Sequence, residues 1–207
     1  MNAYQFAKSN AANLLKTERY ATAVVTACLS AHEGLLLAKP IFAVQQHKVT
    51  VHVFYYWPGR TLQHASIATL GGALTSCFAS KVVELRLVQL SNMSLDSSIL
   101  AQCLALQGNK LPFNRIAELL KSLLTPVFND AMPANSLALP VSSLTGLQIK
   151  LSGRLTTQRY GPRQTVSLTH MGSAAKSSIG MTDYSQFTAK NKLGAFTVKV
   201  WLSQHSS

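Results

Sequence analysis

The strongest constraint on the fold lies in the last sixty or so residues, where apolar and polar side chains alternate. Residues 146–152 place a leucine or isoleucine at every second position, and residues 196–202 do the same with phenylalanine, valine and leucine. A period of two built from branched and aromatic residues predicts strands with one buried face. The other face of each strand carries a lysine, Lys150 or Lys199. We therefore expect a sheet whose exposed face is cationic.

Positive charge is concentrated in the same region. The formal net charge of the chain is +12, and residues 131–207 contain eight Lys or Arg against one acidic residue, Asp183. A globular chain this basic is typical of proteins that bind nucleic acid. The alternative is a basic domain that pairs with an acidic protein. With 47% hydrophobic residues the chain has enough apolar side chains to bury a core.

Upstream patterns predict an α+β fold of two domains. Residues 1–91 would form the first, with a helix from Asn10 to Gly34, strands at 41–46 and 48–56, a helical region at 67–80 and a strand at 82–90. Residues 92–207 would form the second, with helices at 95–108 and 112–128, a loop at 131–145 and a strand-rich part at 146–207. Within this last part we expect a further strand at 163–170 and a basic connection at 171–192.

No pattern of catalytic residues is visible. The seven acidic residues are spread over the chain without a pair in one motif, and the glycine-rich phosphate and nucleophile motifs are missing. Three cysteines and six histidines form no metal-binding spacing, so we expect neither a metal nor another cofactor. No apolar run reaches the ~18–20 residues of a membrane span. The expectation is a protein that is not an enzyme and has no membrane span.

A binding surface remains as the candidate site. Cations position phosphates, and exposed aromatic side chains stack on bases. The candidate RNA-binding residues are Lys150, Arg154, Arg159, Tyr160, Arg163, Lys176, Lys190, Lys192 and Lys199. For Trp201, packing in the core or at its rim is favoured over stacking on a base.

Two motifs at the ends of the strand-rich region resemble the C-terminal domain of the small-subunit ribosomal protein number three family. Residues 152–155, Ser-Gly-Arg-Leu, match the end of its opening strand, and residues 198–202, Val-Lys-Val-Trp-Leu, resemble its terminal strand. Asp183-Tyr184 and Arg159-Tyr160 fall where that family has an Asp-Tyr pair and an Arg/Tyr-rich hairpin. The resemblance implies a protein of the small-subunit head that binds small-subunit rRNA beside family proteins ten and fourteen.

The N-terminal half resembles that family's type II KH domain, whose order is helix, strand, strand, helix, helix, strand. Pro58-Gly59 stands where the family has Pro-Gly before its GXXG loop, which would fall at residues 63–66. That stretch is Gln-His-Ala-Ser and lacks the glycines that let such a loop approach an RNA backbone. The resemblance therefore implies a degenerate KH-like domain that serves as a protein scaffold.

The family also lines the channel through which mRNA enters with cations on the helix after the KH domain, and here only Arg115 keeps one. These departures, and the sequences of residues 156–160 and 183–190, resemble mitochondrial forms from fungi and other microbial eukaryotes. The expectation is a structural protein of the mitochondrial small ribosomal subunit, in the matrix, close to mRNA. A free-standing RNA-binding regulator and an enzyme acting on nucleic acid are the alternatives.

Overall fold

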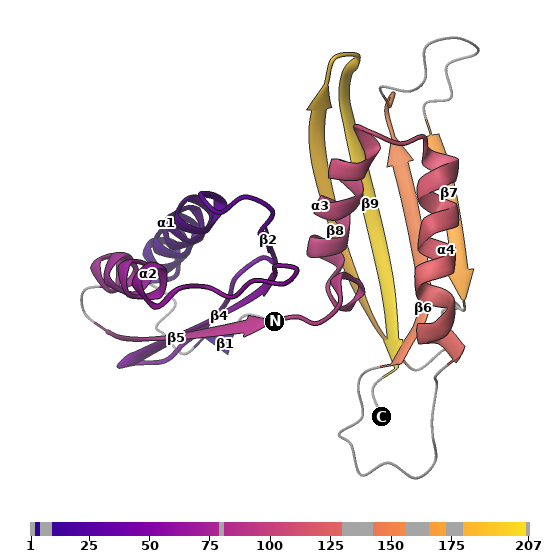
Figure 1. Ribbon diagram of the computed structural model, residues 1–207. Helices are drawn as coiled ribbons and strands as arrows, with labels where there is room; N and C mark the ends of the chain where they lie inside the picture. Colours follow the sequence, from indigo (N-terminus) through magenta and orange to yellow (C-terminus); the bar gives the residue numbers. More distant parts are fainter. Residues whose placement is uncertain are drawn as a thin grey trace. The chain divides into compact units, whose positions relative to one another are not determined.

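The chain divides into two compact units in this computed structural model. Unit 1 comprises Met1–Asn92 and unit 2 comprises Met93–Ser207. The structure describes residues 3–4, 10–78, 81–129, 143–155, 166–172 and 180–205. Within each unit two helices lie over one face of a sheet (Figure 1). The α+β class expected from the sequence is confirmed.

Unit 1 is built on a mixed sheet. Its elements are β1 (Ala3–Tyr4), α1 (Ala11–Ser30), β2 (Leu36–Leu37), β3 (Ile41–Val44), β4 (Lys48–Tyr56), α2 (His64–Cys77) and β5 (Val82–Gln89). The strand order is β1-β3-β4-β2, and β5 also pairs with β4. The long strand β4 runs antiparallel to β2 and β3 and parallel to β5.

The core of unit 1 lies between the helices and one face of this sheet. On α1, Ala21, Val25 and Leu29 recur at every fourth position and are buried, which is the spacing of one helix face. Every second residue of β4 is buried, as its alternation predicts. Leu70 and Leu74 of α2 complete the same core.

The connection from β4 to β5 differs from the expected KH order. One helix, α2, stands there, whereas the type II KH order has two. The stretch expected to hold the glycine loop becomes the beginning of this helix, because Gln63 precedes it and His64 is its first residue. Neither a helix–loop–helix arrangement nor a glycine loop exists at this place in the described chain.

Unit 2 is built on a four-stranded antiparallel sheet. Its elements are a 3-10 helix (Met93–Leu95), α3 (Ser97–Gly108), α4 (Phe113–Asn129), β6 (Ser143–Ser152), β7 (Val166–Gly172), β8 (Gly180–Asn191) and β9 (Gly194–His205). The strand order is β7-β6-β9-β8. Helix α3 packs on β8 and β9, and α4 packs on β6 and β7 (Figure 1).

The beginning of α3 has a local cause, and its last residue lies close to the sheet. The Asp96 carboxylate accepts hydrogen bonds from the amides of Ser98 and Ile99 at 2.9 and 3.0 Å, so it caps the helix. At the other end Gly108 lies close to the sheet, where an added Cβ would come within 3.2 Å of Leu155 Cδ2. The missing side chain lets this end of α3 approach the sheet core.

Two expectations for unit 2 are wrong in detail. The stretch 171–192, expected as a connection, contains the edge strand β8. On the side of β8 that faces the helices, Asp183 and Ser185 stand opposite the buried Leu202 and Val200. The alternation of apolar residues in β8 is therefore too weak to predict a strand. Strand β6 begins at Ser143, inside the range assigned to a loop, and residues 131–142 lie outside the described chain.

Candidate nucleic-acid interface

The two central strands of unit 2 bring two candidate lysines side by side. The apolar side chains of β6 and β9 join the core beneath α3 and α4, so the residues between them face the other way. We call this second side the open face of unit 2. Its residues are Val166, Leu168 and His170 of β7, Gln148, Lys150 and Ser152 of β6, Thr197, Lys199 and Trp201 of β9, and Tyr184, Gln186 and Thr188 of β8. Lys150 lies directly opposite Lys199.

The two lysines form a pair of like charges. The open face of unit 2 contains no Asp or Glu, and within the described chain neither lysine has an acidic partner. Like charges directly opposite on neighbouring strands destabilise a sheet. Two ammonium groups held together in this way favour an anion that contacts both.

An aromatic pair lies next to the lysines. Trp201 stands opposite Tyr184, with ring centroids 5.1 Å apart and planes inclined by 38°. The Tyr184 side chain is 47% exposed, and its hydroxyl donates to Gln186 Oε1 at 3.1 Å. Trp201, interpreted from the sequence as a core or rim residue, is half-buried and packs against Tyr184 on the open face of unit 2. Its place on this face follows from the alternation, because Trp201 and Lys199 share the same phase.

Three further candidates gather at one end of the sheet. Arg154 follows β6, Lys190 lies near the end of β8, and Lys192 lies in the turn to β9. The Asn191 Nδ2 group donates to the carbonyl oxygen of Arg154 at 2.8 Å and so joins the two segments. Lys190 and Lys192 are exposed and Arg154 is half-buried. This end of the sheet therefore presents a second cationic group.

The backbone conformation of the Ser-Gly-Arg-Leu motif requires glycine at position 153. Gly153 has φ +119°, and a Cβ there would lie 2.7 Å from Phe196 Cα and 2.8 Å from the carbonyl oxygen of Ala195. Only glycine avoids both contacts and adopts this φ without strain. Leu155, fully buried, then ends the motif in the core. The motif thus directs the chain past β9 and leaves Arg154 beside the β8–β9 turn.

The remaining candidates lie elsewhere. Arg115 is on α4, and its Nη1 lies 3.5 Å from Glu118 Oε2, with the two side chains 69% and 67% exposed. An exposed pair of this kind contributes ~0–1 kcal/mol, so it leaves the guanidinium available to a phosphate. Arg159, Tyr160, Arg163 and Lys176 lie outside the described residues.

Two acidic residues of unit 2, Asp96 and Asp183, accept hydrogen bonds from amides at the beginning of α3. Asp183 Oδ2 accepts from the amide of Ser97 at 3.0 Å, beside the capping residue Asp96. Burial raises the pKa of Asp96 above its ordinary value, and the hydrogen bond from the Ile99 amide opposes this shift. The hydrogen bond to Asp183 ties the edge strand β8 to the first turn of α3.

In the described parts of the chain no His, Cys, Asp and Glu side chains group as metal ligands, and no helix there has the length and apolarity to cross a membrane.

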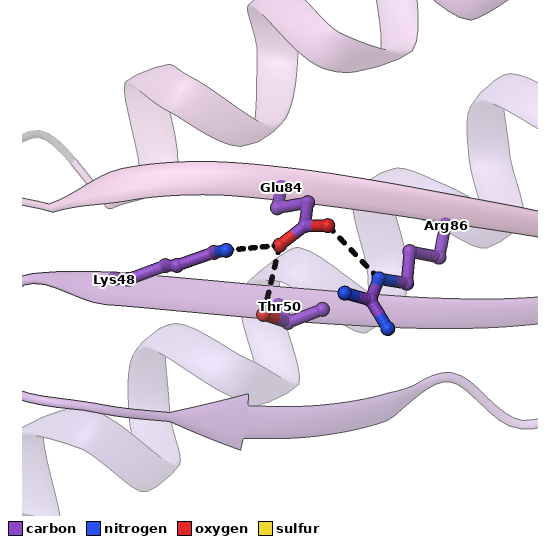
Figure 2. A network of polar contacts seen from close by, with 4 residues as sticks. All are labelled: Lys48, Thr50, Glu84 and Arg86. Carbon is purple, nitrogen blue, oxygen red and sulfur yellow. Dashed lines mark hydrogen bonds and ion pairs between the residues drawn. The ribbon is translucent and has the colours of Figure 1, made fainter.

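The corresponding side of the sheet in unit 1, away from α1 and α2, carries a network of ion pairs around one carboxylate (Figure 2). Glu84 of β5 pairs with Lys48 and accepts from Arg86 Nε at 2.9 Å, and Thr50 Oγ1 donates to it at 3.4 Å. The hydrogen bond from Lys48, followed by that from Arg86, lowers the pKa of Glu84 from 4.5 to about 2. We call this side of the sheet, which carries Lys48, Thr50, Glu84 and Arg86, the open face of unit 1. Its two cations are already bound to a carboxylate.

Comparisons with known proteins identify relatives that match most of the chain. A family model described as "Mitochondrial ribosomal protein (VAR1)" matches residues 35–205. The small ribosomal subunit protein uS3m of Mycosarcoma maydis is 32% identical over 194 residues, which cover 84% of this chain and 70% of that protein. The matched range runs through both units, so the similarity is not confined to the C-terminal motifs.

Proposed function

Because this chain belongs to the mitochondrial ribosomal protein (VAR1) family, we propose that it anchors rRNA in the small subunit of the mitochondrial ribosome. Membership makes it a structural protein of the mitoribosome with a role in translation. Its similarity to the small-subunit protein uS3m agrees with the resemblance to the protein number three family. Within the subunit we assign it to the head, near the channel through which mRNA enters, as that resemblance implies.

The observation that carries the proposal is a group of lysines in unit 2 that have no acidic partner among the described residues. Lys150 and Lys199 stand together on the open face of unit 2, and Lys190 and Lys192 extend from one end of the sheet. Lysine and arginine that replace the counterions of phosphates supply most of the affinity of a protein for an RNA backbone. Unit 2 is therefore the rRNA anchor.

Unit 1 has a different role in this proposal. Its elements β3, β4, α2 and β5 keep the type II KH order except that one helix stands in place of two, and α2 begins where the glycine loop would clamp RNA. Its open face has its charges satisfied internally. Unit 1 is thus a degenerate KH-like scaffold that contacts neighbouring proteins, in the family those numbered ten and fourteen.

A reduced contact to mRNA completes the proposal. Arg115 on α4 keeps one cation at the positions with which the family lines the mRNA channel, and its partner Glu118 is as exposed as Arg115 itself. A single guanidinium on the surface can hold a phosphate but supplies little force for strand separation. The chain therefore guides mRNA rather than unwinding it.

Gradient sedimentation of a native mitochondrial extract tests this proposal. We expect the chain, carrying a C-terminal epitope tag, to migrate with the small subunit and to shift with it when subunits associate. A signal confined to the light fractions would contradict the proposal and favour the alternative, a free-standing RNA-binding regulator. Crosslinking of the purified subunits then reports whether Lys150 and Lys199 contact rRNA.

An enzyme acting on nucleic acid is the third candidate, and Asp183 is its test. Asp96 and Asp183 are neighbouring carboxylates, but both accept hydrogen bonds from backbone amides of α3. We expect incubation of the purified chain with a labelled RNA to leave the RNA intact. Cleavage that disappears in Asp183→Asn would overturn the non-enzymatic assignment.

A further inference from the structure

The open face of unit 2 has a composition that the role of a general phosphate binder does not explain. Besides Lys150 and Lys199 it presents the Tyr184–Trp201 ring pair and the apolar side chains of Val166 and Leu168, which are 46% and 58% exposed. Both helices of the unit pack on the opposite side of the sheet. Cations alone would suffice to hold a duplex by its backbone. The nearly half-exposed Tyr184 ring, with Trp201 beside it, offers a ligand a surface on which to stack.

The arrangement of these residues follows from the strand register. One row across the sheet contains Leu168, Lys150, Lys199 and Gln186, and the next contains His170, Gln148, Trp201 and Tyr184. Lys199 and Trp201 are two residues apart on β9, so their Cα atoms are about 7 Å apart along the strand. One nucleotide can therefore place its phosphate at the lysine pair and its base at the ring pair.

An unpaired base is the ligand that fits such rings. In an A-form duplex the bases are stacked on each other, so a protein aromatic on a flat surface cannot reach their faces. In a single strand the bases are free to stack on aromatic side chains, whatever the sequence. Tyr184 is nearly half exposed, and Trp201 supports it from the neighbouring strand.

We propose that the open face of unit 2 binds an unpaired segment of RNA, with phosphates at Lys150 and Lys199 and a base stacked on Tyr184. The inference rests on the proposed function, since it assumes that unit 2 is the rRNA anchor. To that function it adds that the bound RNA is single-stranded and that the open face of unit 2 holds it. The face is selective for single strands because only they offer both groups at once.

The first experiment removes the lysine pair from the full chain. Binding of a labelled oligouridylate and of a blunt RNA duplex of equal length is measured by fluorescence anisotropy over a range of salt concentrations. For Lys150→Gln/Lys199→Gln we expect the slope of log K against log salt for oligouridylate to become shallower by about 1.4, two phosphate contacts at ~0.7 each. The thermal midpoint should not fall, because a like-charge pair is removed.

The matched control is Lys16→Gln/Lys110→Gln, which loses the same charge from exposed lysines of α1 and of the turn that follows α3. It should keep the wild-type slope. An equal change in this control would show a response to net charge alone and would overturn the proposal. An unchanged slope in the open-face variant would also overturn it.

The second experiment tests stacking. Tyr184→Leu keeps apolar cover over Trp201 but removes the phenol ring, and we expect binding of oligouridylate to weaken about fivefold or more, with duplex binding unchanged. Tyr20→Leu is the control, since Tyr20 is 65% exposed on α1. An equal loss for oligouridylate and duplex would exclude a role in recognising unpaired bases.

Two results separate this inference from the proposed function. If the wild-type chain binds neither probe nor a transcript of small-subunit rRNA, the proposed function itself fails. If the lysine variant binds both probes as the wild type does yet no longer enters small subunits, the face contacts a protein, and only the inference fails.

Discussion

The two units place helices on one side of a sheet and treat the other side in opposite ways. On the open face of unit 1, Glu84 stands between Lys48 and Arg86 and binds both (Figure 2). On the open face of unit 2, Lys150 and Lys199 stand opposite each other, and no carboxylate is present. The two cations of unit 1 share a carboxylate, whereas the two lysines of unit 2 have none on their face. The two units share the α+β architecture and differ in the pattern of charge on their open faces.

The largest expected effect is a loss of stability in unit 2 when Gly153, whose backbone passes close to β9, is replaced. Gly153→Ala places a Cβ within 2.7 Å of Phe196 Cα at φ +119°. We expect unit 2 to lose about 3 kcal/mol of stability, from strain and overpacking together. Denaturant unfolding followed by Trp201 fluorescence in a Trp57→Phe background measures it. An unaltered midpoint would contradict the close approach of the motif to β9.

The same substitution in unit 1 should have the opposite sign. Gly72 lies within α2 and an added Cβ meets nothing within 4 Å. We expect Gly72→Ala to stabilise unit 1 by about 1 kcal/mol, because alanine loses less conformational entropy in a helix. Trp57 fluorescence in a Trp201→Phe background reports this unit. A loss of stability would mean that α2 is packed more tightly than the structure shows.

A third substitution gives unit 2 the carboxylate that unit 1 possesses. Gln186 stands opposite Lys199, and Gln186→Glu retains the acceptor for the Tyr184 hydroxyl. We expect unit 2 to gain ~0.2–1 kcal/mol from the cross-strand pair. The salt slope of RNA binding should fall by about 0.7, because one phosphate site is neutralised. Gln46→Glu in the β3–β4 turn of unit 1 adds the same charge and should change neither the stability of unit 2 nor the salt slope. An equal fall of the salt slope in this control would show that both units respond to charge in the same way.

The smallest effect is expected on the surface of unit 1. The pKa of Glu84 is lowered from 4.5 to about 2, so its contacts stabilise the folded unit above pH 4.5 and this contribution is lost as the pH falls toward 2. The side chain is 33% exposed, so solvent screens the interaction. Trp57-monitored unfolding should show a steeper loss on acidification for the wild type than for Glu84→Gln. Parallel curves would show that the network does not stabilise unit 1.

Local patterns predicted the strands of unit 2 where one face is fully apolar. The alternation around Lys150 and Lys199 located β6 and β9 and placed both lysines away from the core, as the structure confirms. The same reasoning missed β8, whose helix-facing side includes Asp183 and Ser185. An edge strand receives its stability from pairing with β9 and from the Asp183–Ser97 hydrogen bond, which no local pattern contains.

The glycine loop illustrates another limit of sequence reasoning. The absence of glycine at residues 63–66 was visible in the sequence, but not what replaces the loop. The structure continues these residues into α2, since His64, Ala65 and Ser66 are compatible with a first helical turn.

The sequence by itself determined the α+β class, the excess of cations in the C-terminal region and the motifs that indicate the ribosomal family. These depend on composition and on spacing along one strand, where a period of two decides which side chains share a face. Only the tertiary structure decided that Lys150 meets Lys199, that Trp201 meets Tyr184, and that Gly153 passes against β9. Such neighbours lie on strands distant in sequence, and their register is set by the packing of the whole sheet against its helices.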